Sequence, residues 1–268
     1  MLREPVWDVP EYQLHQFSLR SKPYAVCVFV LNEGKKFLAQ LSEMQPLTES
    51  VDIIVADGGS SDGSTDLAQL ASFGIRTLLV KTGEGKLSAQ MRMALSYCLQ
   101  EDYEGIITID GNHKDDTQGI PLFVQAFQEG YDHLQGSRFV PGGKATRTPL
   151  TRWIGIRAIH APLIRAVSGY PYTDTTNGFR GYSRRFLLDP RVAPFRSCFQ
   201  TYELHYYLAV RAGELGFKVK EIPVTRTYPA NGRTPTKIRP VSGNLSILSI
   251  LLKTLFHRYD PSPEDHAE

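Results

Sequence analysis

The stretch that most constrains the fold is a short apolar run that leads directly into polar side chains. Ile106 to Ile109 is mostly β-branched and lies between two glycines, a pattern typical of a parallel strand covered on both faces. Asp110 and Asn112 follow it, and residues two apart point to the same side of an extended chain. Both would therefore face the crevice in which open α/β sheets bind ligands. The motif predicts an oxygen-ligand site for a hard divalent cation, or a polar turn that only shapes the backbone.

Other segments repeat this order of apolar strand, polar loop and helix. Strands are predicted at 24–31, 51–56 and 75–80, and each is followed by a predicted helix, at about 37–44, 65–73 and 87–99. A further helix is expected at 200–215 and a further strand at 218–224. This alternation predicts an α/β protein with a Rossmann-like, mostly parallel sheet flanked by helices.

The chain of 268 residues, 41% of them hydrophobic, suits one main domain. We expect that domain at 24–240, after an irregular N-terminal arm at 1–23. An apolar helix at 241–258 is too short to span a bilayer, and it either lies in a membrane interface or packs as an ordinary core or dimer helix. The acidic, proline-containing tail at 259–268 is predicted to be disordered.

Charge and cysteine usage restrict the partners and the compartment. A net charge of +2 gives no general case for nucleic acid, but the many arginines between Arg138 and Arg191 suit phosphate groups. The three cysteines form neither a metal motif nor an obvious disulfide framework, and the N-terminus is unlike a secretory signal. A cytoplasmic location is expected.

Several motifs occur in a familiar order along the chain. They are Val30-Leu31-Asn32-Glu33, the loop 55–64 with Asp57-Gly58-Gly59, Gly83-Glu84-Gly85-Lys86, Asp110-Gly111-Asn112, Gly136-Ser137-Arg138-Phe139, Asp174 with Asn177-Gly178-Phe179-Arg180, and Glu221-Ile222-Pro223-Val224. Together these motifs resemble those of the family 2 inverting glycosyltransferases of the GT-A fold, in particular the dolichyl- or polyprenyl-phosphate sugar synthase branch. The resemblance implies a single GT-A domain with C-terminal acceptor-side helices.

The resemblance also implies a nucleotide-diphosphate sugar donor, linked to GDP or UDP, and a divalent metal, Mg or Mn. The residues implied in donor binding are Val30, Asn32, Glu33, Asp57, Gly58, Lys86, Asp110, Gly111 and Asn112. The alternatives to donor binding are purely structural: a tight turn after Asp57 and a simple turn before Lys86. The implied metal ligands are Asp110 and Asn112, with Asp115 or Asp116 as a further candidate. Asn112 replaces the family's second aspartate, and Lys114 stands where some members place a metal ligand.

For the chemistry, the resemblance implies catalytic roles for Asp110, Asp174 and Arg138. The implied phosphate- or acceptor-binding residues are Arg138, Arg157, Asn177, Arg180, Arg233 and Lys237. The expected acceptor is a polyprenyl phosphate at the cytoplasmic membrane face, which would bring peripheral membrane contact. A soluble glycan or small-molecule hydroxyl is the alternative, and Asp174 would then be its general base. A nucleotidyltransferase, a non-catalytic sugar-nucleotide binder and a homo-oligomer are further readings left open.

Overall fold

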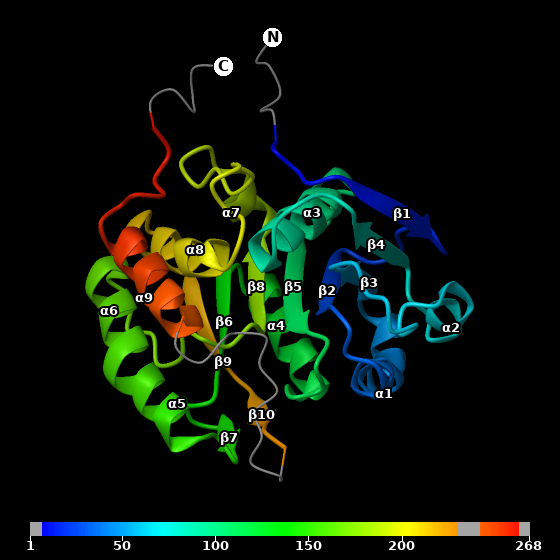
Figure 1. Ribbon diagram of the computed structural model, residues 1–268, viewed down its shortest axis with the longest axis horizontal. Coiled ribbons are helices and arrows are strands. Elements are labelled where there is room, and N and C mark those ends of the chain that lie inside the picture. Colours follow the sequence, from blue (N-terminus) through cyan, green and yellow to red (C-terminus); the bar gives the residue numbers. More distant parts are fainter. Residues whose placement is uncertain (1–6, 230–241, 263–268) are drawn as a thin grey trace.

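The computed structural model describes residues 7–229 and 242–262, which form a central sheet with helices on both faces (Figure 1). The strands of this sheet are β1 (Tyr12–Gln16), β2 (Tyr24–Val30), β3 (Asp52–Asp57), β4 (Thr77–Lys81), β5 (Gly105–Asp110), β6 (His133–Ser137), β8 (Arg180–Ser183) and β9 (Val219–Pro223). Their order is β1-β4-β3-β2-β5-β8-β6-β9, and β7 (Lys144–Thr146) pairs with β10 (Thr225–Thr227) in a second, small sheet.

The predicted alternation of strands and helices is confirmed. The helices are α1 (Lys35–Met44), α2 (Leu67–Ser72), α3 (Leu87–Gln100), α4 (Ile120–Gln128), α5 (Leu150–Ile154), α6 (Ala161–Ser168), α7 (Arg184–Leu188), α8 (Glu203–Glu214) and α9 (Ser242–Leu255). Short 3-10 turns occupy Gln45–Glu49 and Thr117–Gly119, and a π-helical segment at Gly155–His160 joins α5 to α6.

Burial of both sheet faces explains the near-continuous apolar strands. In β2, Cys27 belongs to the core that contains side chains of α3 and α8, whereas its neighbours Val26 and Val28 belong to the core that contains side chains of α1 and α4. Every residue of β2 and of β3 is buried. A strand covered on both faces has no polar face, so the sequence shows an unbroken apolar run there.

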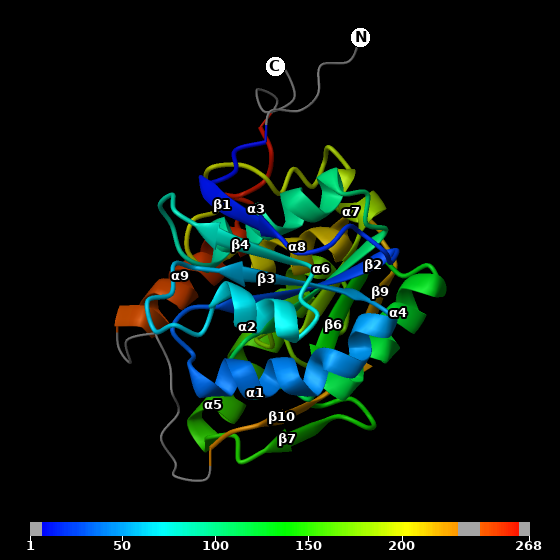
Figure 2. The ribbon, with the colours of Figure 1, turned by 90° about the vertical axis from the view of Figure 1, so that its right-hand side faces the viewer.

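The strand directions gather the predicted site at one edge. β3, β2 and β5 are mutually parallel neighbours, and β8 runs antiparallel to both β5 and β6. The carboxyl ends of β2, β3 and β5, and with them the loops after Val30, Asp57 and Asp110, therefore open on the same edge of the sheet (Figure 2).

The prediction of an irregular N-terminal arm is wrong for Tyr12–Gln16. This segment is the strand β1, which pairs antiparallel with β4 at the outer edge of the sheet. The pairing covers backbone groups that β4 would otherwise leave open, and it needs little apolar sequence, so the composition gave no sign of it. Closer to the N-terminus, Trp7 packs its ring 4.4 Å from that of Phe195.

The apolar helix near the C-terminus is confirmed as α9, which buries Ile250 and Leu251. The prediction of a disordered tail is wrong at its start. Tyr259 is buried, and an Asp260 carboxylate oxygen lies 3.1 Å from Arg211 Nη1. Residues 263–268 lie outside the described residues. No described helix has both the length and the hydropathy needed to cross a bilayer.

Candidate active site

The loops after β2 and β3 are fastened to each other by hydrogen bonds. The Ser61 backbone N–H donates to Asn32 Oδ1 at 2.8 Å, and the Asn32 N–H donates to Ser60 Oγ at 2.9 Å. The buried Asp57 carboxylate accepts from the backbone N–H groups of Ser60 at 2.9 Å and Gly59 at 3.1 Å. Asp57 therefore shapes its own loop, as the tight-turn interpretation predicts, and its contact with a nucleoside stays a prediction.

The glycines of this edge differ in what they permit. A Cβ on Gly58 would meet only ordinary contacts near 3.5 Å, so packing does not require glycine there. A Cβ on Gly111 would lie 3.1 Å from the Phe29 carbonyl oxygen, which favours glycine for close packing of β5 against β2.

The Val30 carbonyl accepts from the Gly58 N–H at 2.8 Å and from Gln90 Nε2 at 3.1 Å. Gln90 is a residue that the sequence analysis missed.

Lys86 and Glu33 lie where two helices begin at this edge. Lys86 is the N-cap of α3, its backbone N–H donates to the Gln200 carbonyl at 2.7 Å, and its side chain is exposed. Glu33 lies two residues before α1, next to its N-cap Gly34, and is partly buried. The start of a helix carries partial positive charge, so the position of Lys86 suits an anion.

Asp110 occupies the centre of the predicted site. Its Oδ2 lies 3.2 Å from Arg226 Nη2 and accepts from Asn112 Nδ2 at 3.3 Å. A Cβ on Gly178 would lie only 2.8 Å from Asp110 Oδ1, so a side chain there would displace the Asp110 carboxylate. The sequence analysis grouped Asp110 with Asn112 and did not single out Arg226.

Arg226 is buried between two carboxylates. It bonds Asp115 as well as Asp110, and its Nη1 lies 3.3 Å from Asn177 Oδ1. Burial opposes the charged form of Arg226, but Asp115 and Asp110 outweigh it and raise the arginine pKa. Burial raises the pKa of Asp115 to about 6 although Arg226 acts in the opposite direction.

The two further metal-ligand candidates have other contacts. Asp115 is engaged with Arg226, as described above, although its Oδ1 has no hydrogen-bond partner. Asp116 is exposed, and its carboxylate caps the 3-10 turn at Thr117–Gly119 by accepting from the Gln118 N–H at 3.0 Å.

The residues present fit a divalent metal poorly. Asp110 is a single carboxylate, and one of its oxygens is already bonded to the Arg226 guanidinium. Asn112 points its amide nitrogen, not its oxygen, toward that same Asp110 oxygen. In favour of an ion, Asn112 Oδ1 is buried without a hydrogen-bond partner. Hard divalent cations prefer several oxygen ligands, usually carboxylates, and a neighbouring cation repels them.

Arg138 and Asp174 form a buried, two-pronged ion pair. Arg138 Nε and Nη2 lie 2.6 and 2.9 Å from the two Asp174 oxygens, and Nη2 also lies 3.0 Å from Thr176 Oγ1. Asp174 is 0% exposed. Burial opposes the charge of Arg138, but Asp174 outweighs it and raises the arginine pKa. The prediction that Asp174 would be the general base for a hydroxyl acceptor is therefore not supported, because its oxygens hold a guanidinium and do not reach solvent.

The contacts of Arg180 and Asn177 do not support the prediction that these residues bind phosphate. Arg180 is buried and donates to the backbone carbonyls of Asn177 at 2.8 Å, Thr175 at 2.7 Å and His205. The Asn177 side chain is buried and accepts from the Phe179 N–H at 3.0 Å. Both residues build the loop that carries Asp174. A guanidinium in this place satisfies carbonyls that would otherwise be buried without donors.

The remaining predicted acceptor residues lie elsewhere. Arg157 is exposed, with its guanidinium 5.3 Å from the centre of the Phe139 ring. Arg233 and Lys237 lie outside the described residues.

Four cations surround Tyr228, which follows β10. Its hydroxyl accepts from Arg152 at 3.0 Å and from Arg138 at 3.4 Å, while Lys114 Nζ and the Arg226 guanidinium lie 5.8 and 6.0 Å from its ring centre. Burial alone would raise the pKa of Tyr228, but the arginines lower it. Burial, followed by Arg226, lowers the pKa of Lys114. We call this group of four cations around Tyr228 the basic ring.

A hollow of about 240 Å³ lies beside the basic ring. It is lined by Lys36, Asn112, His113, Lys114, Arg147, Thr227, Tyr228 and Pro229. The hollow therefore joins the Asp110 motif to a positively charged surface, which suits phosphate groups.

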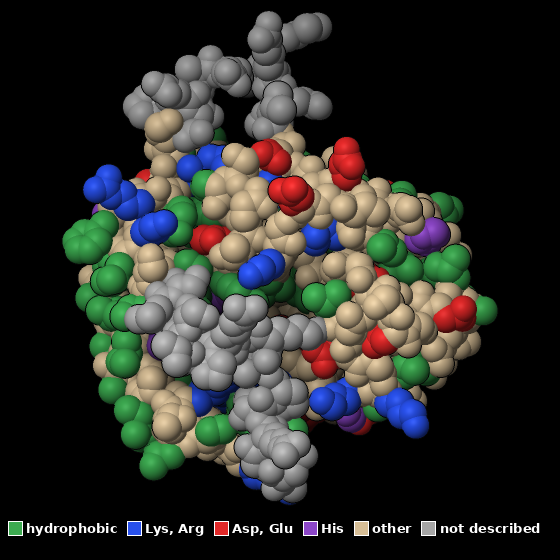
Figure 3. All heavy atoms as spheres, in the orientation of Figure 1, with side chains coloured by type: hydrophobic (Ala, Val, Ile, Leu, Met, Phe, Trp, Pro, Cys, Tyr) green, Lys and Arg blue, Asp and Glu red, His purple; other side chains and the backbone are tan. Residues whose placement is uncertain are grey.

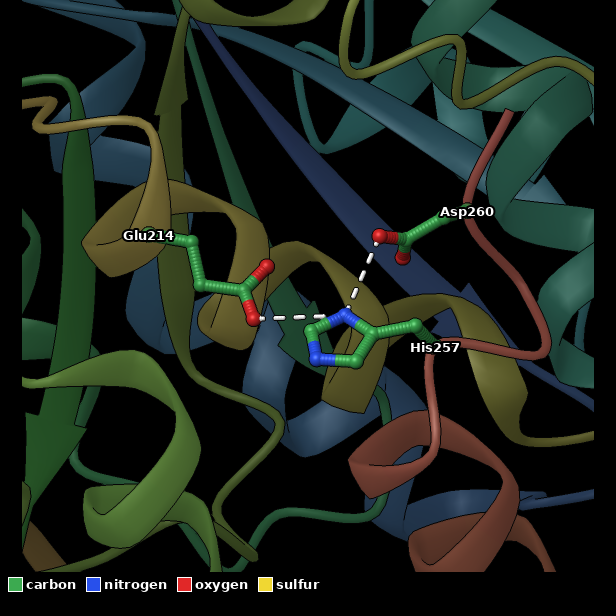
Figure 4. Close-up of side chains that lie close together, drawn as sticks. All are labelled: Glu214, His257 and Asp260. Carbon is green, nitrogen blue, oxygen red and sulfur yellow. Dashed lines mark hydrogen bonds and ion pairs between the residues drawn. The ribbon is translucent and has the colours of Figure 1, made fainter. Parts of the chain in front are cut away.

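A second polar cluster, Glu214, His257 and Asp260, lies at the end of α9 (Figure 4). His257 Nδ1 is 3.1 Å from Asp260 Oδ2 and 3.5 Å from Glu214 Oε1, and Arg211 Nη1 bonds both carboxylates, at 3.1 and 3.2 Å. The arginine supplies the positive charge, so this cluster ties the C-terminal segment to α8.

Residues 25–189 match the glycosyl transferase family 2. The chain belongs to this family and is a glycosyltransferase. Its candidate active site consists of the loop after β5 that carries Asp110 and Asn112, together with the basic ring. It is 27% identical to the glycosyltransferase AglJ of Haloferax volcanii over 82% of this chain and 68% of the relative. It is also 27% identical to the polyprenol monophosphomannose synthase of Mycolicibacterium smegmatis, over 75% of this chain and 76% of the relative.

Among solved structures, the fold is similar to that of glucosyl-3-phosphoglycerate synthase from Mycobacterium tuberculosis in complex with Mn²⁺, UDP and glucosyl-3-phosphoglycerate. The TM-score is 0.62 with 15% identity, and the match covers 90% of this chain and 81% of that one. This similarity confirms the predicted GT-A fold. The family also decides between glycosyl transfer and the nucleotidyltransferase alternative, in favour of the former.

Proposed function

We propose that this glycosyltransferase moves a sugar, with inversion, from a nucleotide-diphosphate sugar to a polyprenyl phosphate at the cytoplasmic face of a membrane. The observation that carries the choice of acceptor is the Arg138–Asp174 ion pair. A hydroxyl acceptor needs a base to take its proton, and the predicted base is buried as a counter-ion. A phosphate acceptor is already anionic and needs cations instead, which Arg152 of the basic ring and Arg147 at the adjoining hollow supply.

In the proposed reaction, an oxygen of the acceptor phosphate attacks the anomeric carbon in line with the departing diphosphate. The new bond joins that carbon to the acceptor oxygen, the bond to the diphosphate breaks, and the nucleoside diphosphate leaves with the electron pair. No proton moves. The nucleoside would lie along the loops of Asn32 and Asp57. Its diphosphate would lie between Lys86 and the loop after β5 that carries Asp110. Negative charge grows on the diphosphate in this step, so fixed cations beside it lower the barrier.

The similarity to a polyprenol monophosphomannose synthase supports a lipid acceptor. So does an apolar strip, defined by the exposed Leu150, Trp153, Ile154, Ile159, Leu248, Leu252 and Phe256 of α5, the segment Gly155–His160, and α9 with its C-terminal end. Hydrophobic side chains gather along the left edge of Figure 3, the side on which Figure 1 places α5, α6 and α9. Lys253 and Arg258 flank a groove in this strip. Exposed apolar side chains edged by cations suit an anionic membrane surface.

The donor half of the proposal is tested by thermal unfolding with GDP, UDP and their sugar conjugates, with Mn²⁺ or with EDTA. A ligand at 100 times its dissociation constant stabilises the folded state by roughly 2.7 kcal/mol, an easily measured shift. We expect stabilisation by one nucleotide family, weakened in Asp110→Ala because this variant no longer holds the Arg226 guanidinium in place. No shift with any nucleotide would reject the donor assignment.

The acceptor half is tested by sugar transfer to three acceptors: a polyprenyl phosphate, a small phosphorylated acid, and a glycan without phosphate. We expect transfer to the first. Transfer to the phosphorylated acid alone would place the acceptor in solution, and transfer to the glycan alone would contradict the phosphate-acceptor proposal.

Membrane contact is tested by flotation with phosphatidylglycerol vesicles. Leu252→Glu with Phe256→Glu should abolish flotation, whereas Leu19→Glu, at an 80% exposed leucine outside the strip, should leave it unchanged. Equal flotation of both variants would refute the strip as the contact surface.

A further inference from the structure

We infer that the Arg226 guanidinium, beside Asp110, supplies much of the positive charge that a divalent metal would otherwise bring. Nucleotide binding by this chain therefore depends only weakly on metal. The inference rests on the proposed function, since it concerns the donor diphosphate. It assigns Arg226 as a further residue of the donor site, in direct contact with the Asp110 carboxylate.

The first argument is that Arg226 is fixed in place. Its strand β10 is held on one side by β7, through the register Arg226–Ala145, and on the other by an antiparallel bridge to Asp115. The Thr227 N–H donates to the Lys114 carbonyl at 2.8 Å, and the Asp116 N–H donates to the Thr225 carbonyl at 2.9 Å. A guanidinium held this firmly loses little freedom on meeting an anion, which is the condition for effective charge stabilisation.

The second argument is the charge balance around Asp110. The carboxylates of Asp110 and Asp115 face Arg226, and Lys114, only 9% exposed, adds a second cation near Tyr228. Asn112 adds no charge where the family's motif has a second aspartate. The protein cations already balance these two carboxylates, so a divalent ion would place two more positive charges beside a guanidinium.

The third argument is the geometry of the ligand set. Asp110 Oδ2 accepts from both Arg226 and Asn112, and Gly178 packs against Oδ1. A metal would have to displace the guanidinium or share Asp110 with it. Near Asp110, the described residues offer two oxygens without a hydrogen-bond partner, Asn112 Oδ1 and Asp115 Oδ1, and Asp115 is already bound to Arg226 through its other oxygen. The arrangement favours the guanidinium over the ion.

The test measures binding of UDP and of GDP by calorimetry, once with Mn²⁺ and once with EDTA. For the wild type we expect the dissociation constant of the preferred nucleotide to change by less than about threefold between the two conditions, which is under 1 kcal/mol. In Asn112→Asp, which restores the second carboxylate, Mn²⁺ should tighten binding by about tenfold or more. Gln118→Glu, an exposed amide-to-carboxylate change nearby, is the matched control and should behave as the wild type.

Removal of the guanidinium gives the converse result. Arg226→Gln should weaken nucleotide binding in EDTA by about tenfold and make it depend on Mn²⁺, whereas Arg226→Lys keeps the charge and should retain most of the binding. Because Arg226→Gln leaves Asp115 buried without its cation, circular dichroism must first show that this variant is folded; Asn112→Asp carries the test if it is not. Electron paramagnetic resonance of free Mn²⁺ gives an independent readout, with more Mn²⁺ bound by Asn112→Asp than by the wild type.

Wild-type binding that weakens tenfold or more in EDTA would overturn the inference while leaving the donor site intact. If neither UDP nor GDP binds under either condition, the proposed function itself fails, and this inference with it.

Discussion

Two parts of the same sheet edge hold their carboxylates in different ways. After β3, Asp57 and Asp62 accept hydrogen bonds from backbone N–H groups and serine hydroxyls. After β5 and in the loop before β8, Asp110, Asp115 and Asp174 are instead held by arginines. A carboxylate that accepts hydrogen bonds only from neutral donors keeps its negative charge, and a negative acceptor suits the N–H and O–H groups of a nucleoside. A carboxylate paired with an arginine has its charge neutralised, so it repels a nearby phosphate less.

The difference also predicts how each part fails. A buried carboxylate that loses its arginine becomes an unpaired charge, whereas one that loses a few neutral donors retains others.

Arg138→Gln should lower the free energy of unfolding by about 3–5 kcal/mol, because Asp174 would be left buried without a cation. Urea unfolding measures this. Combining it with Asp174→Asn should recover most of the loss, since the buried charge is then gone. A loss below about 1 kcal/mol would mean that the pair is not buried as the structure shows.

Asp115 should make stability fall as pH rises. Its pKa is raised by burial from 3.8 to about 6, so the folded state holds a proton more tightly than the unfolded chain. That contribution is fully present below pH 4 and is lost by the time pH exceeds 6, an effect of roughly 3 kcal/mol. Unfolding of the wild type and of Asp115→Asn, compared across this range, should show this additional fall only in the wild type. Parallel curves would contradict the assignment.

Asp57→Asn should cost about 1–3 kcal/mol, less than the loss of Arg138, because an amide oxygen still accepts some of the Ser60 and Gly59 N–H groups. Urea unfolding with Asp66→Asn as control, at an exposed helix cap on the same loop, separates the buried from the exposed carboxylate. A cost equal to that of the control would show that the Asp57 contacts do not stabilise the loop.

Asp62 should give the smallest effect, with a pH dependence opposite to that of Asp115. A hydrogen bond from Ser64 lowers the pKa of this exposed carboxyl below 3.8. Its contribution to stability is present above pH 4 and is lost as pH falls through the lowered pKa. Asp62→Asn should therefore differ from the wild type at pH 6 and converge with it near pH 2. A difference that persists at low pH would contradict this.

The sequence by itself determined the parallel strands, the loops at their carboxyl ends and the position of Asp110, because strand and loop patterns are local. The ordered motifs also sufficed to predict the family. The tertiary structure decided which cation meets which carboxylate: Arg226 lies 116 residues after Asp110 in the chain, and no local pattern pairs them. In the structure Asp174 is the counter-ion of Arg138, although the sequence predicted a base for a hydroxyl acceptor. Arg180 donates to backbone carbonyls, although the sequence predicted phosphate binding. Burial decides these roles, and burial is a property of the folded chain.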